Sequence, residues 1–255
     1  MHDAGFATTD AGAGGVDGGS EVAVLLLYSS LDDANAVTHP AVGTGVGATL
    51  SSTPGDDFAA GHVGGGILSD DPDDFARFAE TDGVHANVEL TRGTMELWFL
   101  PSYDHDDDQK YVLVATGSWP GPGIVTLVKQ NGSNGNALEL VFDELDAAGC
   151  APAPPTCSRR ENRVASSDYA WRAGEWVLIR FTWDWTVPDG TRNVHIYIDG
   201  AEVPLIAGLA TTGPAVVPDE RADDYVWIGN RAPSGGFRAG GVIDEVRVWD
   251  RPLAP

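Results

Sequence analysis

The stretch Gly241-Val242-Ile243-Asp244-Glu245-Val246-Arg247-Val248-Trp249 stands near the C-terminal end of the 255-residue chain. Most of its residues are β-branched or aromatic, a composition that fits a pleated and largely buried strand. A glycine precedes the stretch and Asp250-Arg251-Pro252 follows it, so turn signals bound it on both sides. We predict that this segment is the closing strand of an all-β sandwich.

The rest of the chain has the same character from Glu21 onward. Apolar residues come in short runs between turn signals, and no stripe of 3.6-residue period lasts for three helical turns, which favours strands over helices. The 32 glycines and 16 prolines fit a protein with many turns, and 42% hydrophobic residues can supply a sizeable core. We predict a single domain over residues 21–255. Residues 1–20, rich in glycine, alanine and aspartate, are expected to form a flexible leader.

Alternating side chains mark the strand predicted at residues 94–101. Met95, Leu97 and Phe99 share one face, while Glu96 and Trp98 share the other. The first face therefore belongs to the core and the second is open.

Other strands follow from similar patterns. Residues 22–28 form a continuous apolar run, which predicts a strand covered on both faces. Residues 174–184 and 193–200 are predicted to pair as a hairpin, and Asp199-Gly200 is a strong signal for a two-residue turn. Further strands are expected at residues 111–116, 123–129, 137–142 and 225–229.

Five segments carry a recognisable pattern: residues 93–101, 174–184, 195–200, 227–229 and 241–253. In order and spacing they resemble the laminin-G-like, concanavalin-A-like jelly-roll family. The resemblance covers residues 21–255, although the loop at 143–167 is longer than the family pattern. It implies two antiparallel sheets packed face to face, with ligands commonly bound by loops at one rim. This scaffold carries lectins, adhesins, hydrolases and lyases, so the function must be argued from the site.

The charge balance of the chain is strongly acidic. Its 38 acidic and 15 basic residues give a net charge of −23, and such a field repels phosphate backbones and anionic lipid headgroups. Nucleic acid is therefore not expected as a partner. No run of 18 apolar residues occurs, so membrane insertion is not expected either.

The two cysteines, Cys150 and Cys157, bound a proline-rich loop. Two thiols this close in the sequence fit a disulfide formed in an oxidising compartment, whereas a zinc site would need further Cys or His ligands nearby. We expect a Cys150–Cys157 disulfide and an extracellular location, either secreted or attached to the cell surface. Free thiols are the alternative.

Several side chains are candidates for sugar contact, because sugar rings stack their C–H faces on indoles. Trp98 lies on the open face by alternation, and Trp119 and Trp185 lie in predicted turns, where local packing is the alternative. Glu96 and Tyr197 complete the candidate ligand-binding set. Glu96 also stands where it can form an ion pair with a basic residue across the open sheet.

No complete catalytic set is found in the sequence. Laminarinase-like hydrolases on this fold carry Glu-x-Asp-x-x-Glu, and Glu144 and Asp146 match the first two carboxylates, but Gly149 occupies the third position. A polysaccharide lyase would need cationic and proton-transferring groups together on one open face. The residues available for that role are Arg180, His195 and Tyr197. Whether the chain is an enzyme stays open, and the absence of a complete set favours a non-catalytic role.

The resemblance also implies a structural calcium ion. Related jelly rolls often hold one where the turn after the first strand meets the final strand, and the Asp of an Ile-Asp-Glu-Val-Arg motif is a typical ligand. That residue is Asp244 here, with Asp32 or Asp33 and backbone carbonyls near Gly65 as companions. Carboxylate and carbonyl oxygens are the ligands that calcium prefers. In the alternative interpretation, Asp244 caps a local turn without a metal.

Together these observations predict an extracellular carbohydrate-binding or adhesive domain of a secreted or surface protein from a bacterium. A glycan or polysaccharide is the expected partner. Two alternatives remain: a glycan-active enzyme, either lyase or glycoside hydrolase, on the same fold, and a structural module that binds another protein.

Overall fold

The computed structural model describes residues 22–50, 57–117, 125–143, 159–187, 194–206, 220–231 and 237–254. Some residues singled out by the sequence lie outside these ranges. They are Cys150 and Cys157 of the predicted disulfide, Trp119, and the Glu144 to Gly149 segment.

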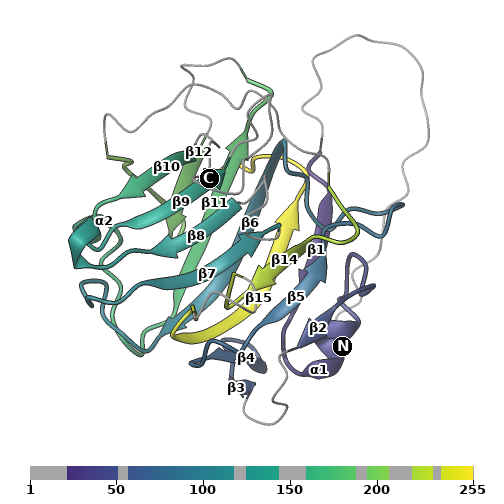
Figure 1. Ribbon diagram of the computed structural model, residues 1–255, viewed down its shortest axis with the longest axis horizontal. Helices are drawn as coiled ribbons and strands as arrows, with labels where there is room; N and C mark the ends of the chain where they lie inside the picture. The colour runs from purple at the N-terminus through teal and green to yellow at the C-terminus, as the bar shows by residue number, and fades with distance from the viewer. Residues whose placement is uncertain are drawn as a thin grey trace, which may run out of the picture.

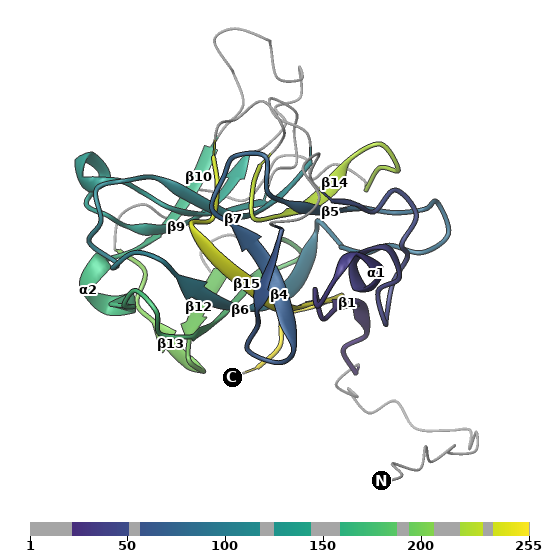
Figure 2. The same ribbon diagram turned by 90° about the horizontal axis from the view of Figure 1, so that it is seen from below.

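The described strands form two antiparallel sheets that face each other (Figure 1 and Figure 2). The eight-stranded sheet has the order β13 (Ala201–Val203), β12 (Val194–Ile198), β11 (Val177–Asp184), β6 (Arg92–Pro101), β15 (Gly241–Trp249), β4 (Gly65–Ser69) and β3 (Phe58–Ala60), with β1 (Leu25–Ser29) also paired to β15. The seven-stranded sheet has the order β10 (Arg159–Val164), β9 (Leu138–Asp143), β8 (Val125–Lys129), β7 (Tyr111–Thr116), β14 (Tyr225–Ile228), β5 (Ala76–Ala79) and β2 (Thr49–Leu50). The two-sheet antiparallel sandwich predicted from the sequence is confirmed.

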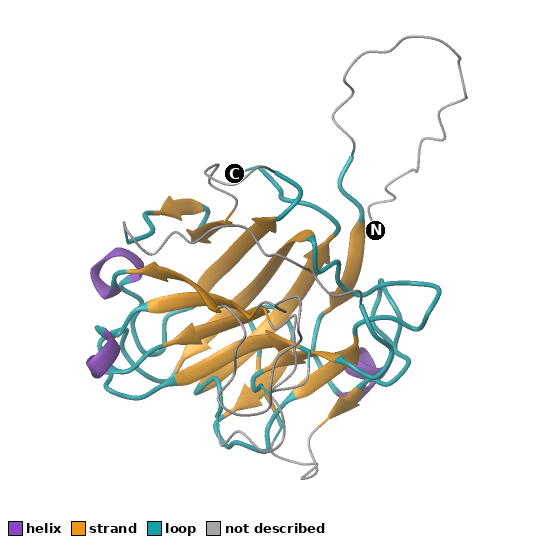
Figure 3. Ribbon diagram, turned by 45° about the horizontal axis from the view of Figure 1, so that its top comes forward, coloured by secondary structure: helices purple, strands orange, loops and turns teal. Residues whose placement is uncertain are grey.

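Within the described residues, helical structure is confined to short segments at the edges of the sandwich (Figure 3). They are α1 (Ala34–Thr38), α2 (Ser166–Tyr169) and the 3-10 turn η1 (Gly132–Asn134). Asp33 caps α1 by accepting a hydrogen bond from the Ala36 amide at 2.8 Å. None of the helices in the described residues has the length and apolar character needed to cross a membrane.

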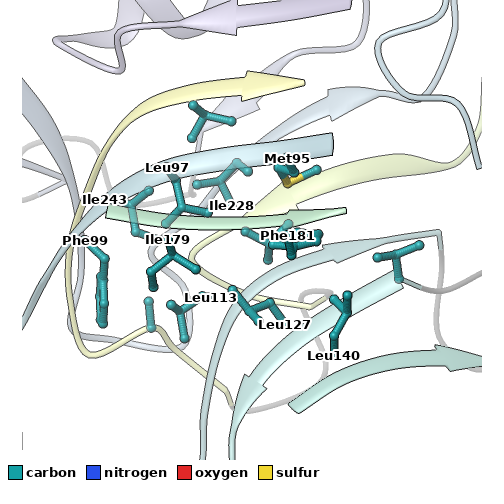
Figure 4. Close-up of a cluster of buried hydrophobic side chains, with 14 of the residues drawn as sticks. Met95, Leu97, Phe99, Leu113, Leu127, Leu140, Ile179, Phe181, Ile228 and Ile243 are labelled. Carbon is teal, nitrogen blue, oxygen red and sulfur yellow. The ribbon is translucent and has the colours of Figure 1, made fainter. Parts of the chain in front are cut away.

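The core lies between the two sheets, where side chains from both layers meet (Figure 4). Met95, Leu97 and Phe99 are fully buried, as the alternation in β6 predicted. They belong to one cluster with the buried Leu113 of β7 and Leu127 of β8. Because each strand contributes every second residue, the sequence pattern fixes which face of each sheet is apolar.

The closing strand β15 lies inside the eight-stranded sheet and changes partner along its length. Its first part, Gly241 to Ile243, pairs with β4, and its last part, Val246 to Trp249, pairs with β1, while β6 pairs with both parts. The register with β6 shifts between Asp244 and Arg247, and Glu245 has a φ of 55°. This is a β-bulge, which bends the strand and leaves an extra residue unpaired.

Two details of the strand prediction were wrong. β1 is only partly buried, and Val22 and Val24 are exposed just before it. One face, with Leu27, packs on the core, whereas the alternate residues Leu26 and Tyr28 lie on the outer face of the sheet. The long loop expected at 143–167 contains β10, which pairs with β9 along Arg159 to Val164. The sequence did not reveal β10 because its residues are mostly charged and show no alternation of apolar side chains.

Glu80 is a buried carboxyl at the end of β5. Its side chain is almost fully buried, Oε2 accepts a hydrogen bond from the Arg221 amide at 3.2 Å, and Oε1 is without a partner in the described structure. Burial raises the pKa of Glu80 to about 7, and the charge of Asp224 adds to the effect.

The stability of the fold should depend on pH through this carboxyl. With a pKa raised from 4.5 to about 7, Glu80 keeps a proton in the folded state that the unfolded chain has lost, so its stabilising contribution is complete below pH 4.5 and disappears as pH rises through 7. Glu80→Gln has no such proton to lose. We therefore expect the free energy of unfolding of the variant, relative to that of the wild type, to be higher at pH 8 than at pH 4.5. Urea unfolding at both pH values measures this, and an equal difference at the two pH values would contradict it.

Candidate functional site

The outer face of the eight-stranded sheet carries a row of polar and aromatic side chains. Backbone pairing places these residues directly opposite one another across six adjacent strands. In order they are Tyr28 on β1, Arg247 on β15, Glu96 on β6, Arg180 on β11, Tyr197 on β12 and Glu202 on β13. We call this set the polar row.

The charges of the polar row are paired with each other. Arg180 contacts Glu96 Oε2 through Nε at 2.8 Å and through Nη2 at 2.6 Å. Arg247 approaches the other oxygen of Glu96 at 3.6 Å, and it also forms an ion pair with Glu245. The hydroxyl of Tyr28 donates to Glu245 at 3.1 Å, and burial, followed by this hydrogen bond, raises the pKa of Tyr28. The ion pair between Glu96 and a basic residue across the sheet, considered from the sequence, is therefore present.

Arg180, His195 and Tyr197 lie on this one face, as the lyase interpretation required. Arg180 is bound to Glu96, and His195 Nδ1 lies 2.9 Å from Glu202 Oε1. Tyr197 is only 4% exposed, and its ring stacks with that of His195. Each group thus has a packing or pairing role in the sheet, which favours a structural function for the row.

An energetic coupling between Glu96 and Arg180 is expected if the polar row stabilises the sheet. Glu96→Gln and Arg180→Gln should each reduce the free energy of unfolding by about 1–3 kcal/mol, since each leaves a charged, largely buried partner with fewer hydrogen bonds. The double variant should lose less than the sum, by about 0.5–2 kcal/mol. Urea unfolding of the four proteins gives the cycle, and strict additivity would show that the contact contributes no stability.

An aromatic patch, formed by His62, Trp98 and Trp176, lies next to the polar row. The imidazole of His62 stacks on Trp98 with ring centres 3.8 Å apart and planes at 7°, and its ring meets Trp176 edge to face at 5.5 Å. His62 is exposed, the two tryptophans are half-buried, and the neighbouring Val63 is 58% exposed. The patch is therefore an apolar surface that solvent reaches, on a sheet face that is otherwise ion-paired.

Three separate segments build the aromatic patch. Trp98 comes from β6, His62 from the turn between β3 and β4, and Trp176 directly precedes β11. The sequence predicted Trp98 as outward-facing but did not identify His62 or Trp176 as its neighbours. No spacing in the sequence brings them together. The contact of His62 with Trp98 depends on the pairing of β15 with both β4 and β6, and that of Trp176 depends on the pairing of β11 with β6.

The opposite end of this sheet face is covered by the C-terminal segment. The Thr94 hydroxyl donates to the Arg251 carbonyl at 2.8 Å and accepts from the Leu253 amide at 2.8 Å. The Ala254 carbonyl lies 3.5 Å from Arg180 Nη1. The aromatic patch is thus at the end that the C-terminal segment does not cover.

Trp185 was also predicted as a sugar contact, and it lies elsewhere. It is half-buried, meets Phe142 edge to face at 4.7 Å, and packs against the core. Its backbone amide donates to the Thr91 carbonyl at 2.8 Å. These contacts agree with the packing interpretation of Trp185.

The residues predicted as calcium ligands all belong to or contact the turn between β3 and β4. Asp32 accepts hydrogen bonds from the Gly65 amide at 2.7 Å and from the Ser30 hydroxyl at 2.6 Å. These bonds, with that from Ser30 as the larger cause, lower the pKa of Asp32. On the other side of the turn, Asp244 accepts from the Val63 amide at 2.9 Å and from the Glu245 amide at 2.7 Å.

The oxygens around Asp244 fit a hard cation. Asp244 is fully buried, burial raises its pKa, and within the described residues no basic side chain forms an ion pair with it. The Gly65 carbonyl oxygen and Asp244 Oδ2 both lie close to the position that a Cβ atom on Gly61 would occupy. The described residues hold no cluster of three or more His, Cys, Asp or Glu side chains suited to a metal. Backbone carbonyls would therefore have to complete the ligand set, as calcium allows.

Comparison with known proteins identifies the family of this fold. A family model described as the concanavalin A-like lectin/glucanases superfamily matches residues 78–255. The chain belongs to this superfamily. A search of curated proteins finds no match.

Solved structures share the concanavalin A-like fold with this chain at low sequence identity. Domain 4 of AbnA, a GH43 extracellular arabinanase from Geobacillus stearothermophilus in complex with arabinotriose, is 21% identical with a TM-score of 0.56, over 92% of this chain and 96% of that one. The binding domain of botulinum neurotoxin serotype G is 12% identical with a TM-score of 0.55, over 91% of this chain and 49% of that one. At these identities the likeness shows a common fold.

Proposed function

We propose that this chain is an extracellular, non-catalytic domain that binds glycans through the aromatic patch of His62, Trp98 and Trp176. The observation that carries the proposal is the solvent-accessible stack of His62 on Trp98, beside Trp176 and the exposed Val63. Sugar rings present C–H faces that pack on such aromatic surfaces. The paired charges of the polar row support a binding role over a catalytic one.

A neighbour of the same fold adds support by analogy. Domain 4 of the arabinanase AbnA was solved with arabinotriose, so a sandwich of this architecture can hold an oligosaccharide. Fold alone does not set the ligand, and the proposal for this chain rests on its own aromatic patch.

Removal of the patch should abolish glycan binding without unfolding the sheet. We expect the wild type to bind members of a glycan array that includes arabino-oligosaccharides. Trp98→Leu and His62→Ala should each weaken binding of the best array glycan at least tenfold in calorimetry, because each removes an aromatic contact with the sugar and a loss of about 1.4 kcal/mol is a tenfold loss of affinity. Trp249→Leu, a half-buried tryptophan on the same sheet but away from the patch, is the control that should retain binding.

Absence of any binding of the wild type on the array would contradict this proposal, and so would patch variants that bind as tightly as the Trp249 control. Release of shortened or unsaturated sugar products by the wild type would show an enzyme in place of a non-catalytic binding domain.

We further propose that calcium binds at the turn between β3 and β4, beside the aromatic patch, with Asp244, Asp32 and the Gly65 carbonyl as ligands. The support is a fully buried carboxylate that lacks a basic partner within the described structure and that already orders the turn carrying His62 through the Val63 amide. A bound divalent ion would supply the missing positive charge and hold that turn in place.

Calcium should therefore raise thermal stability through Asp244. At a calcium concentration of 100 times Kd, binding adds about 2.7 kcal/mol to the free energy of unfolding. We expect a rise in the melting temperature with calcium, reversal by EDTA, and loss of the response in Asp244→Asn. Asp73→Asn, at an exposed aspartate, is the matched control and should keep the response. An equal melting temperature with calcium and with EDTA would refute the site.

A further inference from the structure

Arg77 lies on the outer face of the other, seven-stranded sheet. Strand pairing places it between Thr49 on β2 and Trp227 on β14, and Trp227 lies in turn opposite Ala115 on β7. This face is on the far side of the sandwich from the aromatic patch (Figure 2). Arg77 is half-buried there.

Two aromatic rings hold the guanidinium of Arg77. Its central carbon lies 4.2 Å from the ring centre of Tyr225 and 5.0 Å from that of Trp227. Trp227 is itself fixed, because its indole N–H donates to the Gly117 carbonyl at 3.0 Å and its ring meets Phe75 edge to face at 5.2 Å. The planar group is therefore pre-oriented by cation–π contacts.

Arg77 has no carboxylate partner in the described structure, in contrast to three other half-buried arginines. These are Arg163, paired with Glu139, Arg180 with Glu96 and Arg247 with Glu245. Within the described residues Arg77 has no ion pair, and its buried Nε has no hydrogen-bond partner. In a chain with a net charge of −23, carboxylates are abundant, so an unpaired, pre-oriented guanidinium is unusual.

We propose that Arg77, held by Tyr225 and Trp227, binds the carboxylate of an acidic sugar, namely a uronic acid residue of a glycan. The planar fork of a guanidinium matches a carboxylate with two parallel hydrogen bonds. The half-buried ring of Tyr225 beside it gives an apolar surface on which a sugar ring packs, a surface that an acidic peptide side chain does not need. This is a second site, independent of the aromatic patch and on the opposite sheet.

The experiment is calorimetry of the full chain with trisaccharides of galacturonate, guluronate and mannuronate, with neutral galactotriose for comparison. We expect at least one uronate trimer to bind at least tenfold more tightly than galactotriose. Arg77→Gln should weaken that binding at least tenfold, and Arg77→Lys several-fold, because lysine keeps the charge but loses the fork.

Matched variants separate this site from other effects. Arg172→Gln removes an equal charge at an exposed position and should leave uronate binding unchanged. Trp98→Leu should also leave it unchanged, so that failure of the aromatic-patch proposal and failure of this one are distinguishable. An unfolding transition of Arg77→Gln as cooperative as that of the wild type guards against misfolding as the cause of a loss.

Three outcomes would overturn the proposal. They are the absence of binding to every uronate trimer, equal affinity of Arg77→Gln and the wild type, and equally tight binding of a glutamate tripeptide. The last result would assign Arg77 to an acidic peptide.

Discussion

The bulge at Asp244 and Glu245 is the constraint on which the eight-stranded sheet depends. Before it, β15 pairs with β4, and after it the same strand pairs with β1. The extra residue also changes the alternation, so that Ile243 and Val246 both face the core although they are three positions apart. One strand can thus join two neighbours on the same side and still bury its apolar residues.

The proposed binding region follows from that bulge. Asp244 is opposite Trp98 in the register, and its carboxylate accepts a hydrogen bond from the Val63 amide. This contact orders the turn that places His62 on the Trp98 ring. A calcium ion at Asp244 would strengthen the same contacts. The metal and glycan proposals therefore concern the same turn, although each has its own test.

The two outer faces of the sandwich use their arginines differently. On the eight-stranded sheet, Arg180 and Arg247 share the carboxylate of Glu96, and the charges cancel locally. On the seven-stranded sheet, Arg77 is oriented by aromatic rings and, within the described structure, lacks such a partner. Pairing favours stability of the sheet, whereas an oriented and unpaired charge favours recognition of an anion.

The sequence by itself determined the all-β class, the core face of β6 through Met95, Leu97 and Phe99, the hairpin of β11 with β12, and the outward position of Trp98. These features depend on the two-residue period of a strand and on turn chemistry, both of which are local. Only the tertiary structure decided that His62 lies against both Trp98 and Trp176. It also decided that β10 pairs with β9 despite its charged sequence. The aromatic neighbours of Arg77, in place of a carboxylate, were likewise visible only in the tertiary structure. The physical reason is that strand order and bulges bring together residues far apart in the chain, and no local period encodes which strand becomes the neighbour of which.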